Sequence, residues 1–152
     1  MSNLRFHLIP APLIASSNLV AEAISSEKSV QDIEKLIPLS SYTVVGIGAL
    51  SETATIVKSG SLTQNDQLFL EQSGAIGDIL GHFFDDKGSL IETELESRII
   101  STSLSTLASL DNVIGVAAGI QKKDAIHAAL IGNYLNILIS DEDTAEALLE
   151  KE

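Results

Sequence analysis

Three short stretches of the sequence place polar or flexible residues where a small molecule could bind. The first is Gly46-Ile47-Gly48, at the end of an apolar run. Glycines in such a loop allow the backbone to approach a ligand closely. The stretch does not match the dinucleotide fingerprint, which requires a third glycine where Ser51 stands. A plain tight turn is the alternative interpretation.

The second stretch, GAIGDILGHFF over residues 74–84, carries Asp78 inside an apolar run. A strand interior usually excludes aspartate, so this carboxylate needs either a partner or a function. If the run forms one strand, two-residue alternation places Asp78 on the same face as Leu80 and His82. Asp78 is then either a buried carboxylate held by a backbone amide or by Lys122, or an acceptor for sugar hydroxyls.

The third stretch, Gly119-Ile120-Gln121-Lys122, follows a buried strand and leads into a predicted helix. The amino-terminus of a helix presents unpaired N–H groups and partial positive charge, so a lysine there opposes the helix dipole. That conflict indicates an anion held at this position. A solvated surface lysine is the alternative.

Metal binding and catalysis have weaker support. His82 with Asp85 and Asp86 suggests a metal site, but DDKG over residues 85–88 is typical of a turn, and we expect no metal. No Ser/His/Asp order indicates a nucleophile. His82 could assist Asp78 as a second acid–base group, but four residues along a strand separate them by about 13 Å. We therefore expect no enzyme activity.

The composition is that of one globular domain spanning residues 1–152. Nine Lys and Arg against 21 Asp and Glu give a net charge of −12, which disfavours direct nucleic-acid binding by this chain. A phosphorylated small molecule remains compatible, because local cations and backbone amides can hold it. The absence of cysteine excludes disulfides and thiolate chemistry and fits a cytoplasmic location. No apolar run approaches the length that spans a bilayer.

The elements that position these stretches alternate between strand and helix. We expect strands at residues 6–12, 42–48, 74–84, 113–119 and 137–141, and a hairpin or edge strand within 91–100. We expect helices from 17, from 29, and over 63–70, 103–110, 122–130 and 143–149. This order predicts an α/β fold with a mostly parallel, Rossmann-like sheet, helices on both faces, and the 42–48 run as a central strand. In such sheets ligands bind beyond the carboxyl ends of the strands.

Three segments in this order resemble a known family. They are GIGALSETATIVKSGSL (residues 46–62), GAIGDILGHFFDDKG (residues 74–88), and the region from residue 98 to 149 with VIGVAAGIQKK and NILISDEDTAEALL. The set covers more than two thirds of the chain. It resembles the effector-binding domain of SorC/DeoR-family bacterial transcriptional regulators.

The resemblance implies a fold similar to the glucosamine-phosphate deaminase and ribose-phosphate isomerase group, used for sensing a phosphorylated sugar or polyol. On matching positions, Asp78 would accept hydroxyl hydrogen bonds and Lys122 would contact a phosphate or hydroxyl. Lys58 corresponds to the basic position after the glycine loop. Gly46 and Gly48 would let that loop close on the ligand. The resemblance implies no cofactor.

Two departures from the family pattern bear on these expectations. The family usually has two glycines where Ala118-Gly119 stands. We expect the chain to correspond to the carboxy-terminal portion of such a domain, without the helix-turn-helix segment and the first strand–helix units. An uncovered sheet edge would favour a dimer or tetramer. Two alternatives stay open: an isomerase or deaminase with Asp78 as base and Lys122 as anion anchor, or an assembly remnant that binds no ligand.

Overall fold

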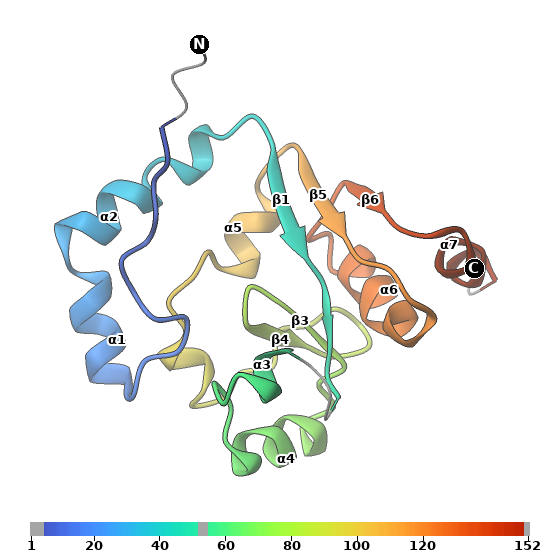
Figure 1. Cartoon of the computed structure of the whole chain (residues 1–152), viewed down its shortest axis with the longest axis horizontal. Helices are drawn as coiled ribbons and strands as arrows, with labels where there is room; N and C mark the ends of the chain where they lie inside the picture. Colours follow the sequence, from blue (N-terminus) through green and yellow to red (C-terminus); the bar gives the residue numbers. More distant parts are fainter. Residues whose placement is uncertain (1–4, 52–54, 151–152) are drawn as a thin grey trace.

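The computed structural model describes residues 5–51 and 55–150, and its centre is a three-stranded parallel sheet (Figure 1). The sheet consists of β1 (Thr43–Gly46), β5 (Val113–Val116) and β6 (Ile137–Ile139), in the order β1-β5-β6. The α/β fold with a parallel sheet is confirmed. The expected central position of the 42–48 run is wrong, because β5 occupies the centre and β1 lies at an edge.

A second, antiparallel sheet contains β2 (Gly48–Ala49), β3 (Gly77–Ile79) and β4 (His82–Phe84). The single strand expected over 74–84 is therefore a hairpin. Leu80 and Gly81 form its loop with φ values of 55° and 86°. Positive φ at both central residues is the pattern of a type I′ hairpin turn, which usually carries Asn-Gly.

The hairpin changes which side chains share a face with Asp78. Asp78 pairs with Phe83 across the two strands, and Ile79 pairs with His82. The expected common face of Asp78, Leu80 and His82 is therefore wrong. Gly48 of β2 pairs with Asp78 on the other side of β3, which places the carboxyl end of β1 beside the hairpin.

Seven α-helices and three short 3-10 helices occur in the described residues. The α-helices are α1 (Asn18–Ser25), α2 (Lys28–Glu34), α3 (Thr55–Lys58), α4 (Gln64–Gln72), α5 (Leu104–Ala108), α6 (Lys123–Ile131) and α7 (Glu142–Leu149); the 3-10 helices are η1 (Ile37–Leu39), η2 (Glu96–Arg98) and η3 (Ile120–Lys122). Side-chain caps begin four of the α-helices, at Ser17, Thr63, Ser103 and Asp141. Within the described part of the chain no helix is long and apolar enough to span a bilayer.

Two expected strands are not found. Residues 6–12 have no regular structure, and the nearest pairing in the described chain is a single bridge between Ile14 and Ile99. Residues 91–100 contain η2 instead of a hairpin or edge strand. Both segments lack the continuous β-branched run that marks the strands of the parallel sheet.

Helices cover one face of the parallel sheet. Buried side chains of β1 and β5 pack with α5 and α6, and the main core includes Val45, Val113 and Ile126. On the opposite face, the register aligns Val44, Ile114 and Ile137 in one row. Val44 is 65% exposed and Ile137 is 41% exposed. The expected helical cover on both faces is thus not found among the described residues.

Candidate ligand-binding site

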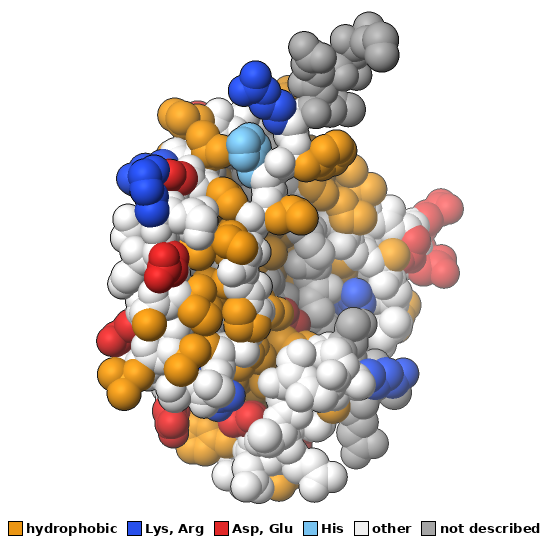
Figure 2. Space-filling model, turned by 60° about the vertical axis from the view of Figure 1, so that its left-hand side comes forward, with side chains coloured by type: hydrophobic (Ala, Val, Ile, Leu, Met, Phe, Trp, Pro, Cys, Tyr) orange, Lys and Arg blue, Asp and Glu red, His pale blue; other side chains and the backbone are white. Residues whose placement is uncertain are grey.

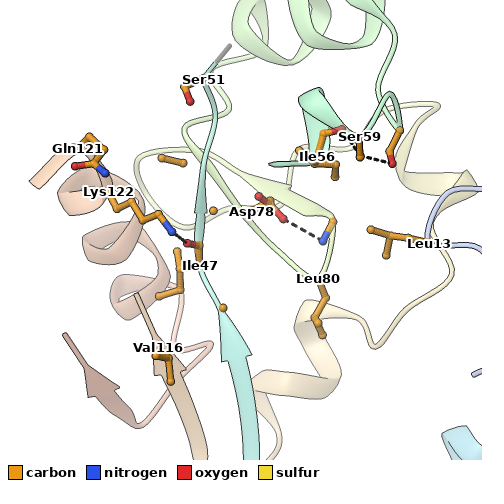
Figure 3. A pocket seen from close by; sticks show the side chains of 15 residues that line it. Leu13, Ile47, Ser51, Ile56, Ser59, Asp78, Leu80, Val116, Gln121 and Lys122 are labelled. Carbon is orange, nitrogen blue, oxygen red and sulfur yellow. Dashed lines mark hydrogen bonds between the residues drawn. The ribbon is translucent and has the colours of Figure 1, made fainter. Parts of the chain in front are cut away.

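A cavity of about 670 Å³ opens where β1 ends and the β3–β4 hairpin begins (Figure 3). Gly46, Gly48, Asp78 and Lys122 all line it, so the structure brings together four of the five residues singled out in the sequence. Lys58 is not among the lining residues; it ends α3 with an exposed side chain, while its neighbour Ser59 lines the cavity. The volume lies in the usual range for small-molecule sites.

The two carboxylate oxygens of Asp78 have different surroundings. Oδ2 accepts a hydrogen bond from the Gly81 amide at 3.1 Å. Oδ1 lies against Gly48, where a Cβ atom would approach it to 2.0 Å. Burial raises the pKa of Asp78 above its usual 3.8, against the lowering effects of the Gly81 N–H, Lys122 and His82. Burial without an ion pair is costly, and a carboxylate kept in this state is typical of functional sites.

Lys122 reaches the same cavity from the loop that precedes α6. It is the last residue of η3, and its Nζ donates to the carbonyl of Ile47 at 3.0 Å (Figure 3). An ammonium has three donors, so two remain for a ligand. Among the described residues no ion pair joins Lys122 to Asp78, although its charge acts on that carboxylate at longer range.

Two residues that sequence reasoning missed hold the loop leading to Lys122. The Gly119 amide donates to Asp141 Oδ2 at 2.8 Å and to Thr144 Oγ1 at 3.0 Å. Gly119 has φ of 108°, a conformation that favours glycine. Asp141 also caps α7, and its hydrogen bonds to Thr144 and Gly119 lower its pKa. The helix-cap pattern DEDT was the available signal.

The remaining lining combines hydroxyl groups with apolar surface. Ser51, Ser59 and Ser61 contribute hydroxyls, and Leu80 and Val116 contribute apolar contacts. Ser59 Oγ donates to the Ile56 carbonyl at 3.0 Å and lies 2.7 Å from Ser61 Oγ. An acidic acceptor, a cation, hydroxyls and apolar patches suit a polyol that carries an anionic group.

Behind the cavity lies a second group of polar residues with the order of a Ser–His–Glu triad. His82, which is 4% exposed, places Nδ1 at 2.7 Å from Glu96 Oε1 and Nε2 at 2.8 Å from Ser101 Oγ. However, the Ser101 hydroxyl donates to the Leu80 carbonyl at 2.8 Å, so its proton is not directed at the imidazole. A nucleophilic serine requires that proton to pass to histidine. The geometry therefore does not support a nucleophile at Ser101.

The acidic turn after β4 has a structural function. Asp85 Oδ1 accepts hydrogen bonds from the amides of Lys87 and Ser89 at 2.9 and 2.8 Å. This is the turn chemistry that the sequence suggested. No cluster of three potential metal ligands occurs in the described portion of the chain.

Comparison with known proteins identifies the family. The family model described as "Putative sugar-binding domain" matches residues 1–150. The chain is 43% identical to the transcriptional regulator LsrR of Klebsiella pneumoniae over 145 residues, which cover 93% of this chain and 45% of that protein. It is 42% identical to LsrR of Escherichia coli O157:H7 over 146 residues, or 94% of this chain and 46% of that protein. The chain thus spans about half the length of these relatives.

Solved structures give the same result. A transcriptional regulator from Streptococcus pneumoniae superposes with a TM-score of 0.86 at 29% identity, covering 93% of this chain and 54% of that chain. The full-length sorbitol operon regulator SorC of Klebsiella pneumoniae superposes with a TM-score of 0.82 at 26% identity, covering 91% of this chain and 45% of that chain. The chain therefore belongs to the sugar-binding domain family of LsrR- and SorC-type transcriptional regulators.

Proposed function

We propose that the cavity binds a phosphorylated sugar or polyol as the effector of a transcriptional regulator. The main support is that a part-buried carboxylate and a cation line one cavity at the end of β1, with no ion pair between them in the described chain. Asp78 would accept hydrogen bonds from two sugar hydroxyls, and Lys122 would bind the phosphate or a hydroxyl. Gly46 and Gly48 would allow close approach of the backbone.

In this proposal Lys58 acts from outside the cavity lining. Its side chain is exposed at the end of α3, next to the serines that line the cavity. From there it would contribute long-range attraction for an anionic effector in a chain whose net charge is −12.

The proposed module is non-catalytic and needs no cofactor or metal. The support is that the relatives are transcriptional regulators and that the Ser101 proton is donated to a backbone carbonyl. We propose a single effector-binding domain that acts in the cytoplasm and responds to its ligand without converting it. DNA contacts would belong to a separate helix-turn-helix segment, since the negative charge of this chain opposes them.

We further propose that the module self-associates. β1 lies at an edge of the parallel sheet, and unpaired edges favour pairing with another chain. Apolar side chains are also numerous on the surface: Figure 2 shows many over the amino-terminal segment and helices α1 and α2, where Phe6, Leu8 and Leu19 are exposed. Large exposed apolar areas commonly mark protein–protein contacts.

A thermal-shift assay tests the proposed function. The chain is mixed with pentose, hexose and hexitol phosphates and, separately, with their unphosphorylated parents. A ligand at 100 times its Kd adds about 2.7 kcal/mol to the free energy of unfolding, which raises Tm by about 5–10 °C for a domain of this size. We expect a shift with at least one phosphate and a smaller shift with its parent.

Matched variants separate site binding from general effects. Asp78→Ala and Lys122→Ala should abolish the shift, whereas Asp86→Ala and Lys123→Ala, which remove like charges outside the cavity lining, should preserve it. Absence of any shift across the panel would refute effector binding by this chain. Conversion of a phosphate to product would instead indicate an enzyme.

A further inference from the structure

The loop between β3 and β4 couples the Asp78 carboxylate to the part-buried group formed by His82, Glu96 and Ser101. Leu80 has φ of 55°, a conformation that bulky residues rarely adopt and that persists only when the surroundings hold it. Two hydrogen bonds hold it here. Asp78 Oδ2 accepts from the Gly81 amide, and Ser101 Oγ donates to the Leu80 carbonyl. The orientation of Asp78 therefore depends on this loop.

The protons in the His82–Glu96–Ser101 group can be counted. The Leu80 carbonyl only accepts, so the one hydroxyl proton of Ser101 lies in that hydrogen bond. His82 Nε2 must then donate to Ser101 Oγ, and another proton lies between His82 Nδ1 and Glu96 Oε1. All three hydrogen bonds form together only while the His82–Glu96 pair holds two protons.

Loss of one proton forces a rearrangement. The Glu96 carboxylate retains the proton at Nδ1, so Nε2 is deprotonated and becomes an acceptor. The Ser101 hydroxyl must then turn to Nε2 and release the Leu80 carbonyl. A strained loop that loses this hydrogen bond holds the Gly81 amide, and through it Asp78, less firmly.

We infer that His82, Glu96 and Ser101 are positioning residues that fix the Asp78 carboxylate only in their doubly protonated form, so that effector affinity falls as pH rises. This inference rests on the proposed function, in which Asp78 binds the effector. It adds a proton-dependent control of that site.

The charged groups facing His82 come from two elements. Glu96 on η2 forms the direct contact, and Asp78 on β3 interacts at longer range. Arg98, also on η2, directs its Nε to the Ala15 carbonyl at 2.9 Å instead.

Hydrogen exchange measured by NMR on the ligand-free protein tests the inference. The rate at the Gly81 amide is compared with the intrinsic rate at each pH from about 5 to 8, the range in which histidine titrates. We expect protection of Gly81 to fall about tenfold across this range, as for loss of one hydrogen bond. The Gly88 amide, which donates to the Asp85 carbonyl in the next turn, serves as the internal control and should not change.

Two variants make the test specific. In Glu96→Gln the side-chain amide can donate a hydrogen bond to Nδ1 of a neutral imidazole, whose proton then stays on Nε2. The Ser101 hydroxyl therefore keeps its hydrogen bond to the Leu80 carbonyl, and protection of Gly81 should stay high at every pH. In Ser101→Ala protection should be low at every pH. The ¹⁵N shifts of the His82 ring in the unmodified protein provide a second readout and should show loss of the Nε2 proton as pH rises.

Constant protection of Gly81 across the pH range, a Nε2 proton that persists throughout, or an unchanged pH profile in Glu96→Gln would each overturn the inference. Since no effector is present, these results are independent of the thermal-shift assay. Failure of that assay alone would refute the proposed function and not the coupling.

Discussion

The Asp78 carboxylate lies directly over Gly48: a Cβ atom at position 48 would come within 2.0 Å of Asp78 Oδ1. The two residues pair across β2 and β3, so the absence of a side chain at position 48 makes room for the carboxylate. Gly48 therefore leaves space for the Asp78 side chain as well as for a ligand.

Replacing each glycine of the 46–48 loop by alanine should give different results. Gly48→Ala should displace Asp78, lower the free energy of unfolding by about 1–3 kcal/mol as in overpacked sites, and abolish effector binding. Gly46→Ala should change stability by less than about 0.5 kcal/mol, since no atom of the described residues lies within 4 Å of the place its Cβ atom would take. Its methyl group would still enter the cavity and weaken binding. Chemical denaturation and ligand titration of both variants check this pair, and equal stability losses would contradict it.

Asp78→Asn should stabilise the ligand-free protein at neutral pH while abolishing binding. Burial raises the pKa of Asp78, so the native state binds this proton more tightly than the unfolded state does. Stability of the unmodified protein should therefore fall as pH rises from 3.8 through the raised pKa, and the asparagine variant should lack this decline. Tm measured against pH for both proteins gives the comparison. A variant less stable than the parent at neutral pH would show that the charge is structurally required.

Lys122→Met should remove the preference for phosphorylated ligands. The variant keeps the apolar stem and loses the charge, and a charge-assisted hydrogen bond contributes about 1.5–3 kcal/mol, or roughly 10–150-fold in affinity. Calorimetric titration with a sugar phosphate and its parent measures the ratio of affinities. A ratio that is unchanged in Lys122→Met would place the phosphate elsewhere, and Lys58→Met is then the variant to examine.

Asp141→Asn should reduce the acid dependence of stability. Hydrogen bonds from Thr144 and Gly119 lower the pKa of Asp141, so the stabilisation is fully present above the usual pKa of 3.8 and is lost as pH falls through the lowered value. Tm recorded from neutral pH into this acid range should fall less in the variant than in the unmodified protein. Parallel curves would mean that the Gly119 loop does not depend on the charge of Asp141.

Self-association should increase with salt. The net charge of −12 makes copies repel one another, and salt screens that repulsion. Light scattering at several ionic strengths should therefore show a dimer or larger species that is favoured by salt. Val44→Lys adds a charge to the exposed face of β1 and should shift the equilibrium toward the monomer. A monomer at high concentration and high salt would contradict this proposal.

The parallel sheet and most helices could be predicted from the sequence because their signals are local. The β-branched runs that form β1 and β5 are continuous, and Ser17 and Thr63 are recognisable caps. The β3–β4 hairpin could not be predicted in this way. Its turn residues are Leu80-Gly81, and a leucine with positive φ gives no turn signal. For the same reason Asp78 and His82 were expected to lie about 13 Å apart along one strand. In the structure they lie on adjacent strands of the hairpin.

The candidate site was predictable to a similar degree. Glycines at strand ends, an aspartate in an apolar run and a lysine before a helix drew attention to Gly48, Asp78 and Lys122, and the structure places all three in the lining of one cavity. The supporting contacts were not predictable. Glu96 reaches His82 from 14 residues away, and Asp141 reaches Gly119 from 22 residues away. Contacts across such separations leave no periodic pattern in the sequence.

Chemical-shift mapping by NMR is the decisive test of effector binding in this cavity, and the chain is small enough for it at 16.1 kDa. A hexose, pentose or hexitol phosphate that raises Tm is titrated into ¹⁵N-labelled protein, and the perturbed amides are located. We expect the largest changes at Gly48, Asp78 and Lys122. Changes concentrated instead in the apolar groove between α6 and α7, around His127 and Leu148, would contradict the proposed site.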